Sequence, residues 1–83
     1  MPQVSYKTEP DLAPAEFARV LAESGLGAHR PIGDATRLAA MLASAGLILT
    51  ARLETGELVG VARCITDFTW CAYLSELAVC PSA

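Results

Sequence analysis

The sequence has few charged residues and no cluster of basic ones. Of its 83 residues, 18% are charged, and the formal net charge is −3. Lys7 is the single lysine, and the arginines are scattered along the chain: Arg19, Arg30, Arg37, Arg52 and Arg63. Because no stretch of positive charge can neutralise a phosphate backbone, we expect no nucleic-acid partner.

Long apolar runs are also missing. The longest ones, such as residues 45–49, fall far short of the ~20 residues that a membrane-spanning helix needs. Residues 1–9 contain no apolar segment of the kind that forms the centre of a secretory signal. The sequence therefore predicts a soluble, cytoplasmic protein without a membrane partner.

Residues that bind metals are few and badly spaced. Cys64, Cys71 and Cys80 are separated by seven and nine residues, and His29, the only histidine, lies far away in the sequence. These spacings match no zinc pattern, so we expect no metal. No base lies near any of the cysteines in sequence, which favours small buried apolar residues in a reducing compartment over a catalytic thiol.

Apolar residues, at 53% of the chain, are sufficient for one small core. The first half of the pattern predicts a strand over residues 3–8 and helices over residues 14–24 and 34–45. Pro14 is suited to the first turn of the first helix, Gly25 to its end, and Asp34 to the N-cap of the second helix.

The second half of the chain predicts three strands, over residues 47–52, 58–66 and 70–79. A turn at residues 54–57 separates the first two, and Gly60 permits a bulge. The apolar run at 47–52 is typical of a strand that is buried on both faces. The order of strand, two helices and three strands predicts an α/β fold of the α+β type, with a mostly antiparallel sheet and helices on one face.

Two segments resemble a known family. Residues 56–63, GELVGVAR, are similar to the third strand of GNAT acetyltransferases, and residues 73–81, YLSELAVCP, are similar to their fourth strand. The resemblance covers nearly the whole chain. It implies one partial domain, residues 1–83, with the front half of the GNAT acyl-CoA N-acyltransferase fold. It also implies acetyl-CoA as the co-substrate and an amine of a small molecule or peptide as the acceptor.

The chain departs from the family pattern after Pro81. In the family, a glycine-rich loop opens a helix there and binds the pyrophosphate of acetyl-CoA through its backbone N–H groups. This sequence ends at Ala83, and neither Tyr6 nor Tyr73 matches the tyrosine that often protonates the departing thiolate. Gly25-Leu26-Gly27 follows a predicted helix, where a C-cap is expected instead of an anion site. We therefore expect an N-terminal fragment that is inactive alone.

The resemblance assigns the remaining site residues. The backbone of Leu77, Ala78 and Val79 is expected to bind the pantetheine arm and to polarise the thioester carbonyl. Glu76, on the same strand, is the candidate general base, since burial among apolar neighbours raises the pKa of a carboxylate. Candidates for the acceptor side are His29, Arg30, Asp67, Phe68 and Trp70.

Two other functions fit the same sequence. The chain could be a non-catalytic module that associates with itself, because an open edge of the fourth strand is a template for pairing with a second copy and forming a homo-oligomer. It could also be complemented by a separate C-terminal half that supplies the phosphate loop. Acetyl-CoA binding by the isolated chain distinguishes the acetyltransferase from the self-associating module.

Overall fold

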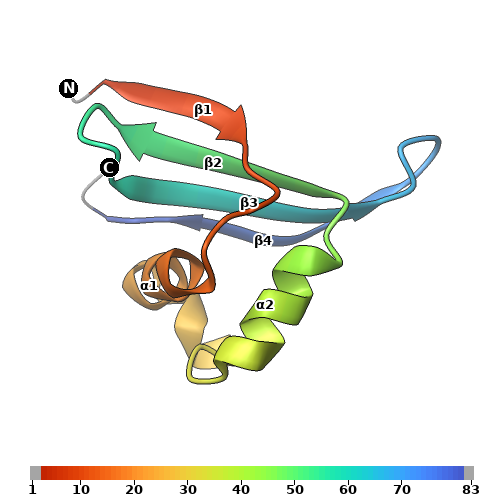
Figure 1. Cartoon of the computed structure of the whole chain (residues 1–83), viewed down its shortest axis with the longest axis horizontal. Helices are drawn as coiled ribbons and strands as arrows, with labels where there is room; N and C mark the ends of the chain where they lie inside the picture. Colours follow the sequence, from red (N-terminus) through yellow and green to blue (C-terminus); the bar gives the residue numbers. More distant parts are fainter. Residues whose placement is uncertain (1–2, 82–83) are drawn as a thin grey trace.

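A computed structural model describes residues 3–81. In chain order (Figure 1) it contains β1 (Val4–Thr8), α1 (Pro14–Ser24), the 3-10 helix η1 (Leu26–His29), α2 (Ala35–Ala43), β2 (Leu47–Leu53), β3 (Leu58–Thr66) and β4 (Ala72–Val79). This order confirms the predicted fold class. None of the helices in the described part has the length and apolar character needed to cross a bilayer.

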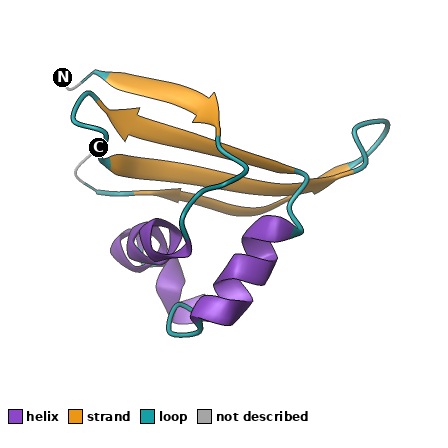
Figure 2. Cartoon of the chain, viewed as in Figure 1, coloured by secondary structure: helices purple, strands orange, loops and turns teal. Residues whose placement is uncertain are grey.

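The four strands form one antiparallel sheet in the order β1-β2-β3-β4. Figure 2 shows both α-helices on the same face of this sheet, as the sequence predicts. β4 is an edge strand of the described sheet, and the loop that joins it to β3 extends past the end of α2 (Figure 1).

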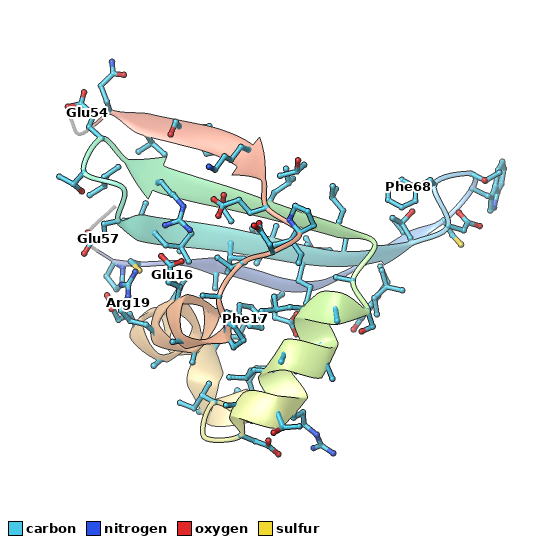
Figure 3. The ribbon with its side chains drawn as sticks, in the orientation of Figure 1. Glu16, Phe17, Arg19, Glu54, Glu57 and Phe68 are labelled. Carbon is cyan, nitrogen blue, oxygen red and sulfur yellow. The ribbon has the colours of Figure 1, made fainter. Side chains whose placement is uncertain are left out.

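The core lies between the two helices and the face of the sheet that they cover. In α1, Phe17, Val20 and Leu21 are buried at the helical spacing of three and four residues. In α2, Leu38 and Leu42 are buried at a spacing of four. Figure 3 shows Phe17 between α1 and α2, beneath the sheet. The other buried apolar residues are Leu12, Ile48, Leu58, Val59, Val61, Ala78 and Cys80.

Local signals set the ends of the helices. Gly25 ends α1 with a left-handed φ of 89°, a backbone conformation that residues with a Cβ seldom adopt. Asp34 caps α2 by accepting a hydrogen bond from the Arg37 N–H at 3.0 Å. The segment between α1 and α2 includes η1, and α2 ends at Ala43, two residues earlier than predicted.

The second face of the sheet has no helix over it among residues 3–81, and its apolar side chains are exposed. Leu49 on β2 is 40% exposed, and Tyr6, Leu77 and Val79 are exposed on the neighbouring strands. Together with other residues of these strands they line a shallow hollow of about 220 Å³. The prediction that residues 47–52 are buried on both faces is therefore wrong for the described structure. Only the alternate residues of β2, Ile48 and Thr50, are fully buried.

An ion-pair network joins β2 to the segment between β1 and α1. Arg52 donates to both carboxylate oxygens of Glu9, at 2.8 and 2.9 Å, and to both of Glu16, at 2.8 and 3.0 Å. The hydroxyl of Thr50 also donates to Glu9. The hydrogen bonds from Arg52 lower the pKa of Glu9 to about 2, although partial burial opposes the shift.

This network predicts acid sensitivity. Because the pKa of Glu9 is lower in the folded state than in the unfolded chain, its contribution to stability is present above about pH 4.5 and is lost as the pH falls towards 2. We expect Glu9→Gln to lower the free energy of unfolding at pH 7 and to flatten its decline between those pH values. Urea unfolding at several pH values measures this. Glu54→Gln, at the exposed β2–β3 turn (Figure 3), is the control, and an equal effect of both variants would contradict the assignment.

Candidate functional site

The fourth strand is interrupted by a bulge. Glu76 pairs with Arg63 and Leu74 pairs with Cys64, so Ser75 is an extra residue on β4. The side chains of Ser75 and Glu76 lie on the same side of the sheet, because the Ser75 hydroxyl donates to Glu76 at 2.9 Å and accepts from Arg63 at 3.0 Å. Two successive side chains on one side indicate a bulge at which the strand turns its backbone.

Glu76 is the buried centre of this region, with 2% of its surface exposed. Arg63 donates to it through Nε and Nη2, and Arg30 donates through Nε at 2.6 Å. Arg63 also donates to the carbonyl oxygen of Met41 at the end of α2, at 3.2 Å. Among the described residues, no buried polar side-chain atom is without a hydrogen-bond partner. The buried charge is therefore compensated by two arginines and a serine.

The protonation behaviour of Glu76 differs from the expectation. Burial raises the pKa of its carboxyl group, but the hydrogen bonds from Arg63, Arg30 and Ser75 outweigh burial, and the net shift is downward. The sequence predicted a raised pKa because it identified the apolar neighbours on β4 but not the two arginines. The prediction of a raised pKa for Glu76 is therefore wrong, because these contacts lower its pKa.

Arg30 is directed inward, towards the bulge. Its Nη2 donates to the carbonyl oxygen of Ser75 at 2.9 Å, and its Nη1 donates to the carbonyl oxygen of His29 at 2.9 Å. The side chain is 24% exposed. Arg30 thus connects the loop after η1 to β4, whereas His29 is exposed at the end of η1.

In the described sheet, the edge of β4 at Leu77 and Val79 pairs with no other strand and is called the free edge. The N–H of Cys80 donates to the carbonyl oxygen of Val59 at 2.8 Å, so it points towards β3. Because N–H groups alternate in direction along a strand, the N–H of Ala78 also points towards β3, and those of Leu77 and Val79 point away from it. Of the three residues predicted to bind through their backbone, only these two present an N–H at the free edge.

The loop between β3 and β4 lies at the far end of the hairpin, where Figure 3 labels Phe68. The Asp67 carboxylate accepts from the N–H groups of Thr69, Trp70 and Cys71, and these bonds lower its pKa to about 2. They also explain why β4 begins at Ala72 and not at residue 70. Phe68 has a left-handed φ of 60°. Trp70 is 93% exposed.

The structure does not bring the predicted site residues into one place. The hollow that Phe68 and Trp70 line in the β3–β4 loop includes neither Glu76 nor Arg30. The cluster at the bulge unites Glu76 and Arg30 with Arg63 and Ser75, which the sequence analysis did not select. The sequence did contain a signal that could have predicted Arg63 as a site residue. Arg63 is the one charged residue of the apolar strand β3, as Glu76 is the one charged residue of β4.

The arrangement matches solved structures of acetyltransferases. A GNAT-family acetyltransferase from Streptococcus pneumoniae TIGR4 superimposes with a TM-score of 0.75 and 18% identity, over 98% of this chain and 55% of that protein. A candidate acetyltransferase from Deinococcus radiodurans R1 gives 0.63 and 22%, over 96% of this chain and 57% of that protein. The chain has a GNAT-type fold. It spans about half the length of these proteins.

Sequence comparison adds no further assignment. No family model matches the chain, and no curated protein matches it. The relation to GNAT acetyltransferases thus rests on the arrangement of helices and strands, which the residues of β3 and β4 predicted.

The buried cluster predicts a large effect of neutralising Glu76. Glu76→Gln leaves two arginines facing a neutral amide, and breaking a buried ion pair costs about 3–5 kcal/mol. We expect a correspondingly lower free energy of unfolding, measured by urea denaturation. Glu23→Gln is the control, because it removes the partner of Arg19 from an exposed pair on α1. Equal losses in the two variants would contradict a stabilising role for the cluster.

Proposed function

We propose that this chain forms the acetyl-CoA-binding sheet of an N-acetyltransferase that acts on an amine of a small molecule or peptide. The observation that carries the proposal is the free edge of β4, where the N–H groups of Leu77 and Val79 point away from β3 beside a bulge. A ligand with amide groups, such as the pantetheine arm, can pair with this edge as another strand would. The GNAT-type fold supports the same function.

The free edge suits the chemistry of acetyl transfer. The amine attacks the thioester carbonyl carbon, the C–S bond breaks with its electron pair on sulfur, and coenzyme A leaves as a thiolate. The proton that the amine loses passes to solvent, and the thiolate takes up a proton from solvent to become a thiol. Negative charge develops on the carbonyl oxygen during attack, and a backbone N–H held in a fixed direction stabilises that charge. In our proposal the N–H of Leu77 or Val79 has this role, because the N–H of Ala78 lies in the ladder with β3.

In this proposal Glu76 is an anchor for β4 and not the general base. Arg30, Arg63 and Ser75 all donate to its carboxylate, and a carboxylate bound by several donors accepts a proton poorly. His29, exposed at the end of η1, stays the predicted acceptor-side residue of that loop. An acceptor role for Asp67, Phe68 and Trp70 and a cytoplasmic location also stay predictions.

We further propose that the isolated chain binds acetyl-CoA weakly and is inactive. Gly25-Leu26-Gly27 adjoins the C-terminal end of α1, and Gly25 is its C-cap. The carbonyl groups at this end give the helix a partial negative charge, which disfavours a pyrophosphate. The N-terminus of α2 is capped by the Asp34 carboxylate, which accepts a hydrogen bond from the Arg37 N–H. This negative group disfavours a pyrophosphate at that end of α2.

Titration with acetyl-CoA and with acetyl-pantetheine, which lacks the pyrophosphate, tests this proposal. We expect both ligands to bind with similar, weak affinity and to shift the NMR signals of the Leu77 and Val79 amides. A micromolar dissociation constant for acetyl-CoA alone, about −8 kcal/mol, would show that part of the chain binds the phosphates.

A substitution can remove one edge donor without removing a ladder hydrogen bond. Leu77→Pro deletes an N–H that points away from β3, a position where an edge strand tolerates proline. We expect this variant to stay folded and to lose acetyl-pantetheine binding, whereas Leu77→Val keeps it. Equal binding by the two variants would rule out the Leu77 N–H as a donor to the ligand.

Self-association is the second candidate function, and the uncovered face of the sheet favours it. Leu77 is 65% exposed, and Tyr6, Leu49 and Val79 lie in the same hollow beside the free edge of β4. An exposed edge next to apolar side chains is a template for a second copy, and two-fold pairing is the commonest symmetry. We propose a homo-oligomer that forms through β4, with Leu74, Leu77 and Val79 near the contact.

Sedimentation equilibrium of a Leu77→Lys variant tests this association. Because Leu77 is largely exposed, we expect the variant to keep its fold and to become monomeric at micromolar concentrations where the original chain is a dimer or larger. Thr36→Lys, which adds the same charge on the exposed side of α2, should leave the assembly intact. A well-folded monomer of the original chain at high concentration would overturn the proposal.

A further inference from the structure

We propose that Arg30 is a positioning residue, which holds the bulge of β4 in place beside the Leu77 N–H at the proposed ligand edge. This inference rests on the proposed binding of an acyl-pantetheine at that edge. It assigns Arg30 a role different from the acceptor contact that its loop position predicts.

The contacts of Arg30 converge on the bulge from a distant part of the chain. Its Nε donates to the Glu76 carboxylate at 2.6 Å, and its Nη2 donates to the carbonyl oxygen of Ser75 at 2.9 Å. These two acceptors belong to consecutive residues, one a side chain and the other the backbone. A third nitrogen, Nη1, donates to the carbonyl oxygen of His29, which fixes the guanidinium relative to its own loop.

The Ser75 carbonyl needs such a donor. Ser75 is the extra residue between the pairs Arg63–Glu76 and Cys64–Leu74, so its backbone is displaced from regular pairing. A half-buried carbonyl without a partner is costly, and the strand could avoid that cost by pairing Ser75 with Cys64. Such a shift would move the residues before Ser75 to the opposite face of the sheet. The hydrogen bond from Arg30 removes the reason for this shift.

Arg30 is one of two arginines that keep Glu76 ionised. Arg63, whose side chain is 8% exposed, already pairs with Glu76 from the neighbouring strand. The side chain of Arg30 is more exposed, at 24%. When a shorter side chain replaces it, water can occupy the space that the guanidinium leaves. The particular contribution of Arg30 is its planar fork, which serves a carboxylate and a carbonyl at once. A lysine has one nitrogen and cannot reproduce both contacts in the same geometry.

The experiment compares Arg30→Lys with Arg37→Lys, a matched substitution on the exposed side of α2. Both variants keep the net charge. Amide hydrogen exchange followed by NMR reports the state of β4 without any ligand. We expect exchange at Glu76 and Tyr73, whose N–H groups point towards β3, to accelerate on the order of tenfold in Arg30→Lys, as the loss of one charge-assisted hydrogen bond implies. Exchange in the core of the sheet, at Leu49 and Ala62, which pair with each other across β2 and β3, should change less than twofold.

Titration with acetyl-pantetheine gives the second readout. We expect the half-saturation concentration, followed by the Leu77 amide signal, to rise several-fold in Arg30→Lys and to stay unchanged in Arg37→Lys. A merely stabilising role would accelerate exchange equally in β4 and in the core, and that outcome would overturn the proposal. So would unchanged exchange at β4, or unchanged binding by Arg30→Lys.

Failure of the proposed function has a different signature. If the original chain does not bind acetyl-pantetheine at any concentration tested, the edge of β4 is not a pantetheine site. The exchange measurement then decides separately whether Arg30 holds the bulge, because it needs no ligand.

Discussion

The buried carboxylate of Glu76 is the point on which the geometry of β4 depends. It lies in the low-dielectric space between the sheet and the helices, where an unpaired charge would be unstable. Arg63 reaches it from β3, Arg30 from the loop after η1, and Ser75 from the adjacent position. These donors bring together parts of the chain that are up to 46 residues apart. A change in any of them alters the strand that carries the proposed ligand edge.

Arginines also make other long-range polar connections. Arg52 on β2 binds Glu9 and Glu16, which lie on either side of the start of α1. Arg19 on α1 donates to the carbonyl oxygen of Leu58 at the start of β3, at 2.6 Å. Because a guanidinium has several donors in one plane, each arginine can bind two partners at once. Four of the five arginines, Arg19, Arg30, Arg52 and Arg63, therefore connect separate elements of the described structure.

Within residues 3–81 the helices cover one face of the sheet only, and both proposals rest on this asymmetry. The two helices bury the face that carries Ile48, Val61 and Ala78, and they leave exposed the face that carries Leu49 and Leu77. An apolar face beside a free strand edge can bind an extended ligand with amide groups or a second copy of the chain. The two acetyltransferases described above are nearly twice as long as this chain. The comparison shows a shared fold.

The order of elements, the helix caps and the GNAT-type fold were determined by local sequence: Pro14, Gly25 and Asp34 mark helix ends, and residues 73–81 carry the pattern of the fourth strand. These features depend on neighbours along the chain. The ionisation of Glu76 does not depend only on its neighbours along the chain. Its pKa is set by Arg30 and Arg63, which strand pairing and packing bring to it. The exposure of Leu49 likewise follows from which face of the sheet the helices cover. A run of apolar residues in the sequence does not say which face that is. Tertiary structure alone decided the partners of the buried charge and the direction of each N–H on β4.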